Sequence, residues 1–221
     1  MKLARRCVAV LLLLICISLC INLLKNPQVE SDTNPTLSLP TQEGVAPPSL
    51  SPEKSQDESV WEKLKLLEKE FPSGSYWNHR GIEISDSVPD WTITTDIPCD
   101  HSVYGDIYCN HYDGATKEFF PQYEHLIQCL GFSSMLSDRI FGEEAPIKIH
   151  RDFNGLRLGD QIRLTGSWHS MLVIEKTQNC VIVAECDEDA TTCEISWGRK
   201  ISKNELTSYG EEIEYITRYT D

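Results

Sequence analysis

Positive charge is scarce in this 221-residue chain beyond its first 25 residues. Those 25 residues hold four basic side chains (Lys2, Arg5, Arg6 and Lys25) and no acidic one. The rest carries 16 basic against 34 acidic residues, a net charge of −18. Such a surface repels phosphate backbones and anionic lipid headgroups, so we expect no nucleic-acid partner. The chain also contains no internal repeat.

Polar residues are almost absent between Cys7 and Leu24, where only Ser18 and Asn22 interrupt a run of apolar or small residues. A helix over this run is about 27 Å long, close to the hydrocarbon thickness of a bilayer. Because the basic residues precede the run, the positive-inside rule predicts a cytoplasmic N-terminus and an extracytoplasmic remainder. The A-x-A pattern of a cleaved signal peptide is missing after it, which favours an uncleaved, single-pass membrane anchor over residues 1–25.

Residues 26–56 lack aromatic and β-branched clusters and are rich in Pro, Ser, Thr, Gln and Glu. This composition cannot bury enough apolar surface to offset the entropy of ordering the chain. We therefore predict a disordered linker that spaces a folded domain from the membrane.

Apolar residues recur at helical spacing at two places after the linker. Residues 57–80 begin with the stripe Val60, Leu64, Leu67 and Phe71, which predicts a short amphipathic helix followed by an aromatic segment. Within residues 81–221, which we take as the main domain, the spacing from Gln128 to Phe141 predicts a second helix.

Strand-like runs rich in Ile, Val and Thr follow the turn Gly159-Asp160, separated by turn residues. The predicted strands cover residues 162–164, 170–174, 181–184, 194–197 and 213–218. A helix followed by an antiparallel sheet predicts an α+β fold.

Cys129 opens the predicted helix, where the helix dipole favours a thiolate and free backbone N–H groups can bind an oxyanion. A nucleophilic thiolate needs a base, and His169 at the start of a predicted strand is the candidate. If residues 176–179 form a hairpin turn, the next strand brings Glu185 and Asp187 beside His169. Two residues apart on one strand, these carboxylates are expected to share a face, so either can orient the imidazole.

Four short motifs together resemble the CHAP amidohydrolase/peptidase superfamily. They are Gln128-Cys129-x-Gly131-Phe132, Leu158-Gly159-Asp160-x-Ile162-Arg163, His169-Ser170-x-Leu172-Val173-Ile174 and Glu185-x-Asp187. The resemblance covers residues 120–218, although Asp187 stands where the family usually has Asn and no basic wall-binding repeat is present.

This resemblance implies a papain-like cysteine hydrolase domain in which the nucleophile's helix packs on an antiparallel sheet. It further implies Cys129 as nucleophile, His169 as base, Glu185 or Asp187 as orienting residue and Gln128 near the oxyanion site. Members mostly cleave amide bonds in bacterial peptidoglycan peptides or amidated metabolites. The expected function is that of an amidase or endopeptidase at the bacterial cell surface, with peptidoglycan or another amide as substrate and no cofactor.

Two alternatives to a wall hydrolase remain open. A papain-like domain that has lost its chemistry can serve as a surface-displayed binding module, and an active one can act on proteins instead of the cell wall. A low thiol pKa separates an active site from an inactive one, and a substrate panel separates the two hydrolases.

Six cysteines lie beyond the predicted anchor, and an oxidising exterior favours disulfides among them. Cys99 with Cys109, and Cys186 with Cys193, would each close a small loop. The pattern Cys99-x-His101…Cys109-x-His111 also has the ligand types of zinc. Paired zinc ligands are normally separated by two to four residues instead of one, so we favour a disulfide or a plain loop and predict no metal.

Overall fold

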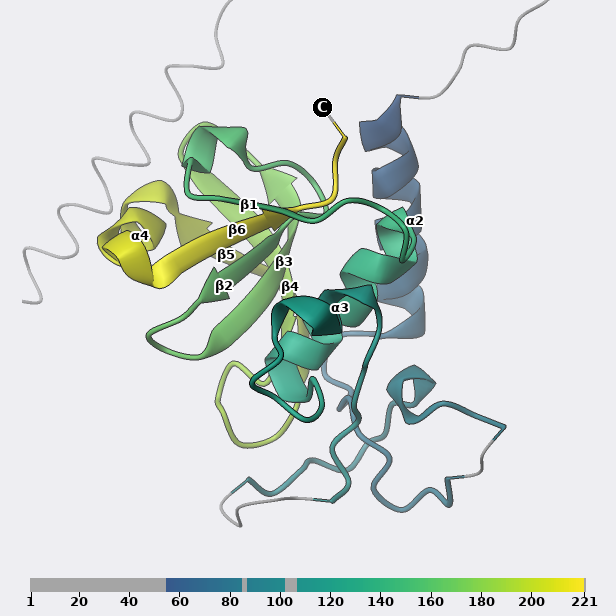
Figure 1. Ribbon diagram of the computed structural model, residues 1–221. Coiled ribbons are helices and arrows are strands. Elements are labelled where there is room, and N and C mark those ends of the chain that lie inside the picture. Colours follow the sequence, from purple (N-terminus) through teal and green to yellow (C-terminus); the bar gives the residue numbers. More distant parts are fainter. Residues whose placement is uncertain (1–54, 85–86, 102–106, 221) are drawn as a thin grey trace, which may run out of the picture. The chain divides into compact units, whose positions relative to one another are not determined.

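The computed structural model describes residues 55–84, 87–101 and 107–220 (Figure 1). The predicted anchor (1–25) and nearly all of the predicted linker (26–56) lie outside these residues. In the part that is described, no helix is both long and apolar enough to cross a membrane.

A single six-stranded antiparallel sheet forms the centre of the described domain. From one edge to the other its strands are β1 (Lys148–His150), β6 (Ile213–Thr217), β2 (Gln161–Leu164), β3 (His169–Lys176), β4 (Cys180–Cys186) and β5 (Ile195–Ser202). Four of the five predicted strands are confirmed within two residues at each end. The predicted strand 194–197 matches only the first part of β5, and β1 is a strand that the sequence analysis missed. The α+β prediction is therefore confirmed.

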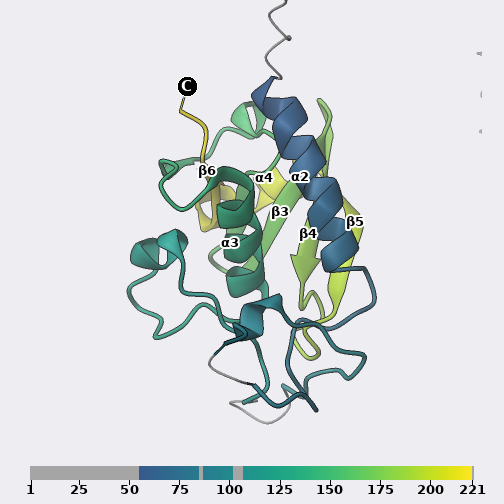
Figure 2. The ribbon, with the colours of Figure 1, turned by 90° about the vertical axis from the view of Figure 1, so that its right-hand side faces the viewer.

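Two helices lie on one face of the sheet (Figure 2). They are α2 (Gln56–Glu70) and α3 (Gln128–Phe141), which confirms both predicted helices. The shorter α4 (Lys203–Ser208) follows β5. Four 3₁₀ turns complete the elements: η1 (Asp90–Thr92), η2 (Ala115–Phe119), η3 (Phe153–Gly155) and η4 (Gly210–Glu212).

Strand β3 shows how the sheet separates two apolar layers. Leu172 faces the layer that contains Phe132 of α3 and Leu64 of α2, whereas Met171 and Val173 face the opposite layer. This alternation is the period of two expected for a strand that is buried on both faces. The sheet thus fixes α3, and with it Cys129, against β3 and β4.

Two glycines, Gly131 and Gly159, allow close packing around α3. A Cβ at Gly131 would lie 2.3 Å from the Leu126 carbonyl oxygen, so only glycine lets the first turn of α3 approach this backbone. Gly159 has φ +82°, and a Cβ there would lie 2.8 Å from the Phe141 ring. Both glycines therefore help to seat α3 against the rest of the domain.

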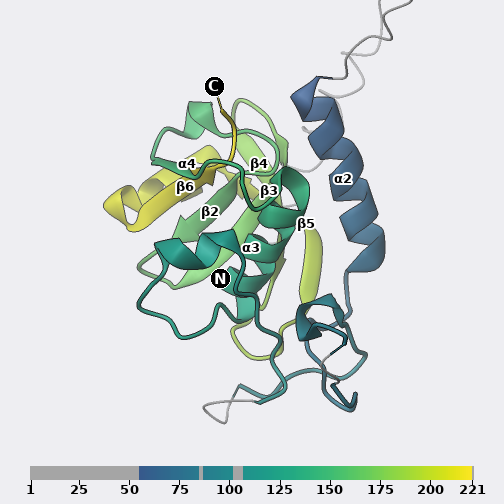
Figure 3. The ribbon, with the colours of Figure 1, turned by 45° about the vertical axis from the view of Figure 1, so that its right-hand side comes forward.

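The described residues between 71 and 127 contain little regular structure and form the loops that extend beyond the N-terminal end of α3 (Figure 3). Trp77 anchors them, since it is fully buried, packs its ring 5.5 Å from that of Phe132 and donates a hydrogen bond to the Trp91 carbonyl. His79 is also buried and lies 3.1 Å from the Asn110 side-chain oxygen. The aromatic segment that follows α2 thus packs against α3 through Trp77.

Candidate active site

Cys129, His169 and Glu185 come together where the N-terminal end of α3 meets strands β3 and β4. The imidazole Nε2 of His169 lies 2.7 Å from Glu185 Oε2. The Cys129 thiol donates a hydrogen bond to the Trp168 carbonyl at 3.5 Å and is near enough to His169 to raise its pKa. Because Nε2 is engaged by Glu185, Nδ1 is the nitrogen left for the thiol. The register that pairs Met171 with Glu185 in the β3–β4 hairpin produces this arrangement, as the sequence analysis predicted.

The electrostatics favour a charged imidazole beside the thiol. Burial lowers the pKa of His169, but its interactions with Cys129 and Glu185 outweigh burial and raise the pKa to about 9. Burial raises the pKa of Glu185, yet His169 and Arg199 outweigh that effect and lower it. Glu185 is therefore held as a carboxylate that can stabilise an imidazolium.

Arg199 on β5 is a positioning residue that the sequence analysis missed. Its guanidinium binds both carboxylate oxygens of Glu185, with Nη2 at 2.6 Å from Oε2. A bidentate arginine–carboxylate pair fixes the carboxylate plane, and with it the direction from which His169 is held. The predicted strand stopped at Trp197, two residues short of Arg199, because residues 198–200 carry no apolar signal.

Asp187 does not share the face of Glu185, contrary to the prediction. The backbone leaves the strand at Asp187, where φ is +62°, and the alternation of side chains ends there. Its Oδ1 instead accepts hydrogen bonds from the backbone N–H groups of Thr192 and Cys193 and lies 3.3 Å from His101 Nδ1. Of the two candidate carboxylates, Glu185 is thus the one in contact with His169.

Two depressions in the surface meet at Cys129. One, of about 520 Å³, is lined by apolar and aromatic side chains that include Tyr123, Ile127 and Trp168. The other, of about 380 Å³, runs past His169 towards Arg199. Cys129 lies between two possible subsites, as a nucleophile that cleaves within a longer substrate must.

Left-handed backbone conformations gather around this site. The described residues other than glycine with positive φ are Gln128, Trp168, Asp187, Ala190 and Cys193. The first four line the two depressions, and Gln128 and Trp168 directly precede Cys129 and His169. Such conformations cost of order 1–3 kcal/mol each and concentrate at functional sites.

Gln128, expected near the oxyanion site, lines both depressions. Its side-chain amide nitrogen lies 3.3 Å from His101 Nδ1. The residue before the nucleophile therefore connects the cleft to a second cluster of side chains.

Among the described residues, none of the six cysteines forms a disulfide. The sulfurs of Cys99 and Cys109, one expected pair, lie 3.5 Å apart. Cys193, expected to pair with Cys186, has its sulfur 3.8 Å from that of Cys109. Three of the four cysteines in the expected disulfides thus gather in one place, which the sequence analysis did not predict.

No known protein family, characterised protein or solved structure matches this chain. The resemblance to the CHAP superfamily rests on the motifs alone and stays a prediction.

Proposed function

We propose that the described domain is a papain-like cysteine hydrolase that cleaves amide bonds. The observation that carries this proposal is the hydrogen-bonded series Arg199–Glu185–His169 beside the Cys129 thiol, which lies at the junction of two depressions. A nucleophile, a base and a third group that orients the base are the minimum set for acyl transfer.

In the proposed reaction the Cys129 thiol gives its proton to His169 Nδ1, and the sulfur attacks the amide carbonyl carbon. The C–N bond then breaks, and the leaving amine takes the proton from His169, which leaves a thioester on Cys129. A water molecule next gives a proton to His169 and attacks the thioester carbonyl. The C–S bond breaks, and the carboxylic acid product leaves the thiolate beside the imidazolium.

The first turn of α3 is suited to stabilise the tetrahedral intermediates. Cys129 is the second residue of the helix, whose first N–H groups have no partner within the helix. These donors, together with the positive end of the helix dipole, favour an oxyanion beside the attacking sulfur. The Gln128 side chain borders the same place.

Arg163 supports a substrate that carries a carboxylate. It lines the larger depression, is only 4% exposed and donates hydrogen bonds to the neutral hydroxyl groups of Ser170 and Tyr123. Within the described residues no carboxylate pairs with it. Peptidoglycan stem peptides, rich in carboxylates, match this site, and the anchor predicted for residues 1–25 would hold the domain at the cell surface.

The reactivity of Cys129 tests the proposal. We would purify the full chain in detergent, treat it with iodoacetamide at pH 6 and locate the modified cysteines by peptide mass spectrometry. An ordinary thiol is about 0.3% thiolate at this pH, so a thiolate paired with imidazolium should react up to roughly 100-fold faster. The His169→Ala variant should lose this advantage, whereas the control Cys180→Ala should keep it.

Turnover of purified muropeptides, followed by mass spectrometry, tests the substrate. Wild type and Cys180→Ala should release new amine and carboxyl ends, and Cys129→Ala should release none. If Cys129 reacts no faster than N-acetylcysteine, the domain is a binding module and the proposal fails. A reactive Cys129 without muropeptide turnover would instead point to protein substrates.

A further inference from the structure

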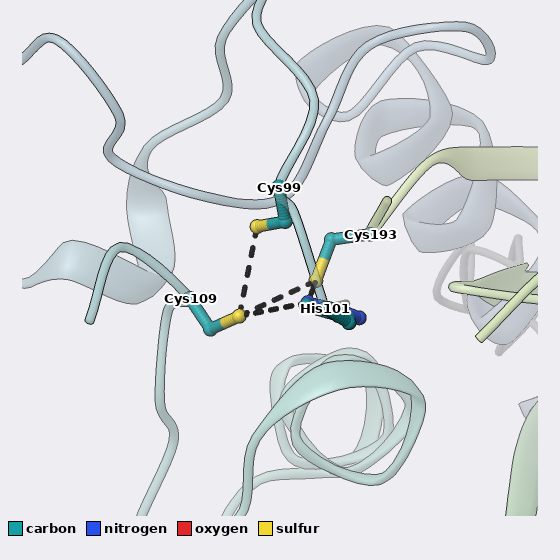
Figure 4. A group of neighbouring side chains, drawn as sticks. All are labelled: Cys99, His101, Cys109 and Cys193. Atoms are coloured by element: carbon teal, nitrogen blue, oxygen red, sulfur yellow. Dashed lines mark hydrogen bonds between the residues drawn. The ribbon is translucent and has the colours of Figure 1, made fainter. Parts of the chain in front are cut away.

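Four side chains from three separate segments converge beside the proposed active site (Figure 4). They are Cys99, His101, Cys109 and Cys193, and their sulfur and nitrogen atoms all lie within 4.8 Å of one another. Cys99 and Cys193 are buried, and the other two are partly buried. Three thiols and an imidazole form the Cys₃His set of structural zinc sites.

The four atoms lie close enough together to surround a tetrahedral ion, although the His101–Cys109 distance is shorter than the edge of such a site. Bonds of about 2.3 Å to sulfur and about 2.0–2.1 Å to nitrogen imply sulfur–sulfur edges of about 3.8 Å and sulfur–nitrogen edges of about 3.5 Å. The sulfur–sulfur distances are 3.5 Å for Cys99–Cys109 and 3.8 Å for Cys109–Cys193. His101 Nε2 lies 3.0 Å from the Cys109 sulfur and 3.5 Å from that of Cys193.

A carboxylate orients the histidine of the cluster. His101 turns Nε2 towards the sulfurs, while its Nδ1 lies 3.3 Å from Asp187 Oδ1. Histidine ligands of zinc commonly donate their second N–H group to a carboxylate, which fixes the tautomer and strengthens the ligand. Asp187, which does not contact His169, acquires a role here.

A disulfide explains the cluster less well than a metal. A disulfide between any two of the thiols would not explain why the third sulfur and His101 Nε2 lie in the same small space. The imidazole nitrogen approaches two of the sulfurs, and all three sulfurs converge on one point (Figure 4).

We propose that Cys99, His101, Cys109 and Cys193 bind one structural zinc ion. With four protein ligands the site is closed, so its role is to join the loops around residues 99 and 109 to the turn between β4 and β5. The ion lies next to Gln128 through His101. It thereby stabilises the backbone that presents Cys129, without taking part in the reaction.

Metal content is the first test. We would express the full chain with added ZnCl₂, purify it in detergent under reducing conditions and measure zinc by mass spectrometry. We expect one equivalent of zinc in the wild type and in the control Cys180→Ser, whose sulfur lies outside the cluster beside the Thr177 hydroxyl. Cys99→Ser and Cys193→Ser should each hold far less.

Two further measurements keep the test valid if the cysteine variants fail to fold. The wild type reconstituted with Co²⁺ should show the intense visible bands of tetrahedral thiolate coordination. Asp187→Asn keeps all four ligands and should weaken zinc affinity about 10- to 100-fold, measured by competition with a chromophoric chelator.

Three results would overturn the proposal. The first is a wild type purified under these conditions without zinc and without a cobalt spectrum. The second is zinc that all cluster variants retain. The third is an intact mass two hydrogens short, with a Cys99–Cys109 disulfide in the peptide map. None of these results depends on hydrolytic activity, so this proposal and the proposed function can fail separately.

Discussion

Two carboxylate–histidine pairs lie side by side in this domain and have different surroundings. Glu185 holds His169, and Asp187, two residues later, holds His101. The free nitrogen of His169 faces one thiol at the meeting point of two depressions. The free nitrogen of His101 faces a cluster of three thiols. We therefore assign the same pair to acyl transfer in one place and to metal binding in the other, because the number of thiols that each imidazole faces differs.

The backbone at the end of β4 separates the two pairs. Glu185 is the last residue but one of the strand, whereas Asp187 has a left-handed φ and begins the turn. Had the strand continued, both carboxylates would point to His169. Because Asp187 adopts a left-handed conformation, its carboxylate points to His101 in the loops and not to His169.

The largest effect is expected from removing the charge of Glu185. Glu185→Gln should lower kcat/KM about 10³- to 10⁴-fold, because the neutral amide no longer stabilises the imidazolium or fixes its tautomer. Asp187→Asn should lose much less, since its contact is with His101. Hydrolysis of the muropeptide identified with the wild type provides the measurement. Equal losses in the two variants would break the distinction between the pairs.

A smaller effect concerns the pH dependence of stability that His169 contributes. Its pKa is raised to about 9 in the folded state, so the native protein binds the proton more tightly than the unfolded chain. This stabilisation is fully present below about pH 6.5 and is lost as the pH rises towards 9, by at most about 3 kcal/mol. The unfolding free energy of the wild type in urea, minus that of His169→Gln at the same pH, gives the contribution of His169 to stability. In Cys129→Ala the loss should occur at lower pH, because one of the two contacts that raise the pKa is gone. A difference between wild type and His169→Gln that stays flat from pH 6.5 to 9 would contradict the charged pair.

The proximity of Cys129 and His169, the proposed catalytic pair, was predictable from the sequence because both residues lie on regular elements. Helical spacing placed Cys129 at the start of α3, and the strand pattern with its turn paired β3 with β4. The choice between Glu185 and Asp187 was not predictable, since a period of two assumes that the strand continues. Arg199 was missed because residues 198–200 of β5 include no apolar side chain, so the sequence pattern gave no sign that the strand continues there.

The thiol cluster was not predictable because tertiary structure assembles it. Cys193 lies 84 residues from Cys109 in the chain, and sequence proximity suggested Cys186 as its partner instead. The isolated bridges that join Asn78 to Cys109 and Tyr76 to Glu194 bring these segments together. Neither bridge has a periodic sequence pattern. Spacing rules for zinc ligands do not find the proposed site, because a single residue separates Cys99 from His101 and the other two ligands come from distant segments.

The smallest effect separates the two tasks of Asp187, which caps the turn and orients His101. Asparagine keeps the oxygen that accepts from Thr192 and Cys193 and tolerates a left-handed φ, whereas alanine does neither. With zinc removed by a chelator, Asp187→Asn should match the wild type in unfolding free energy, and Asp187→Ala should lie about 2 kcal/mol lower. With zinc bound, the unfolding free energy of Asp187→Asn should also lie below that of the wild type. Only in that state does the negative charge of Asp187 strengthen His101 as a ligand. Urea unfolding under both conditions measures this. If zinc leaves the two proteins equal, Asp187 serves the turn alone, and the likeness between the two carboxylate–histidine pairs is one of geometry and not of function.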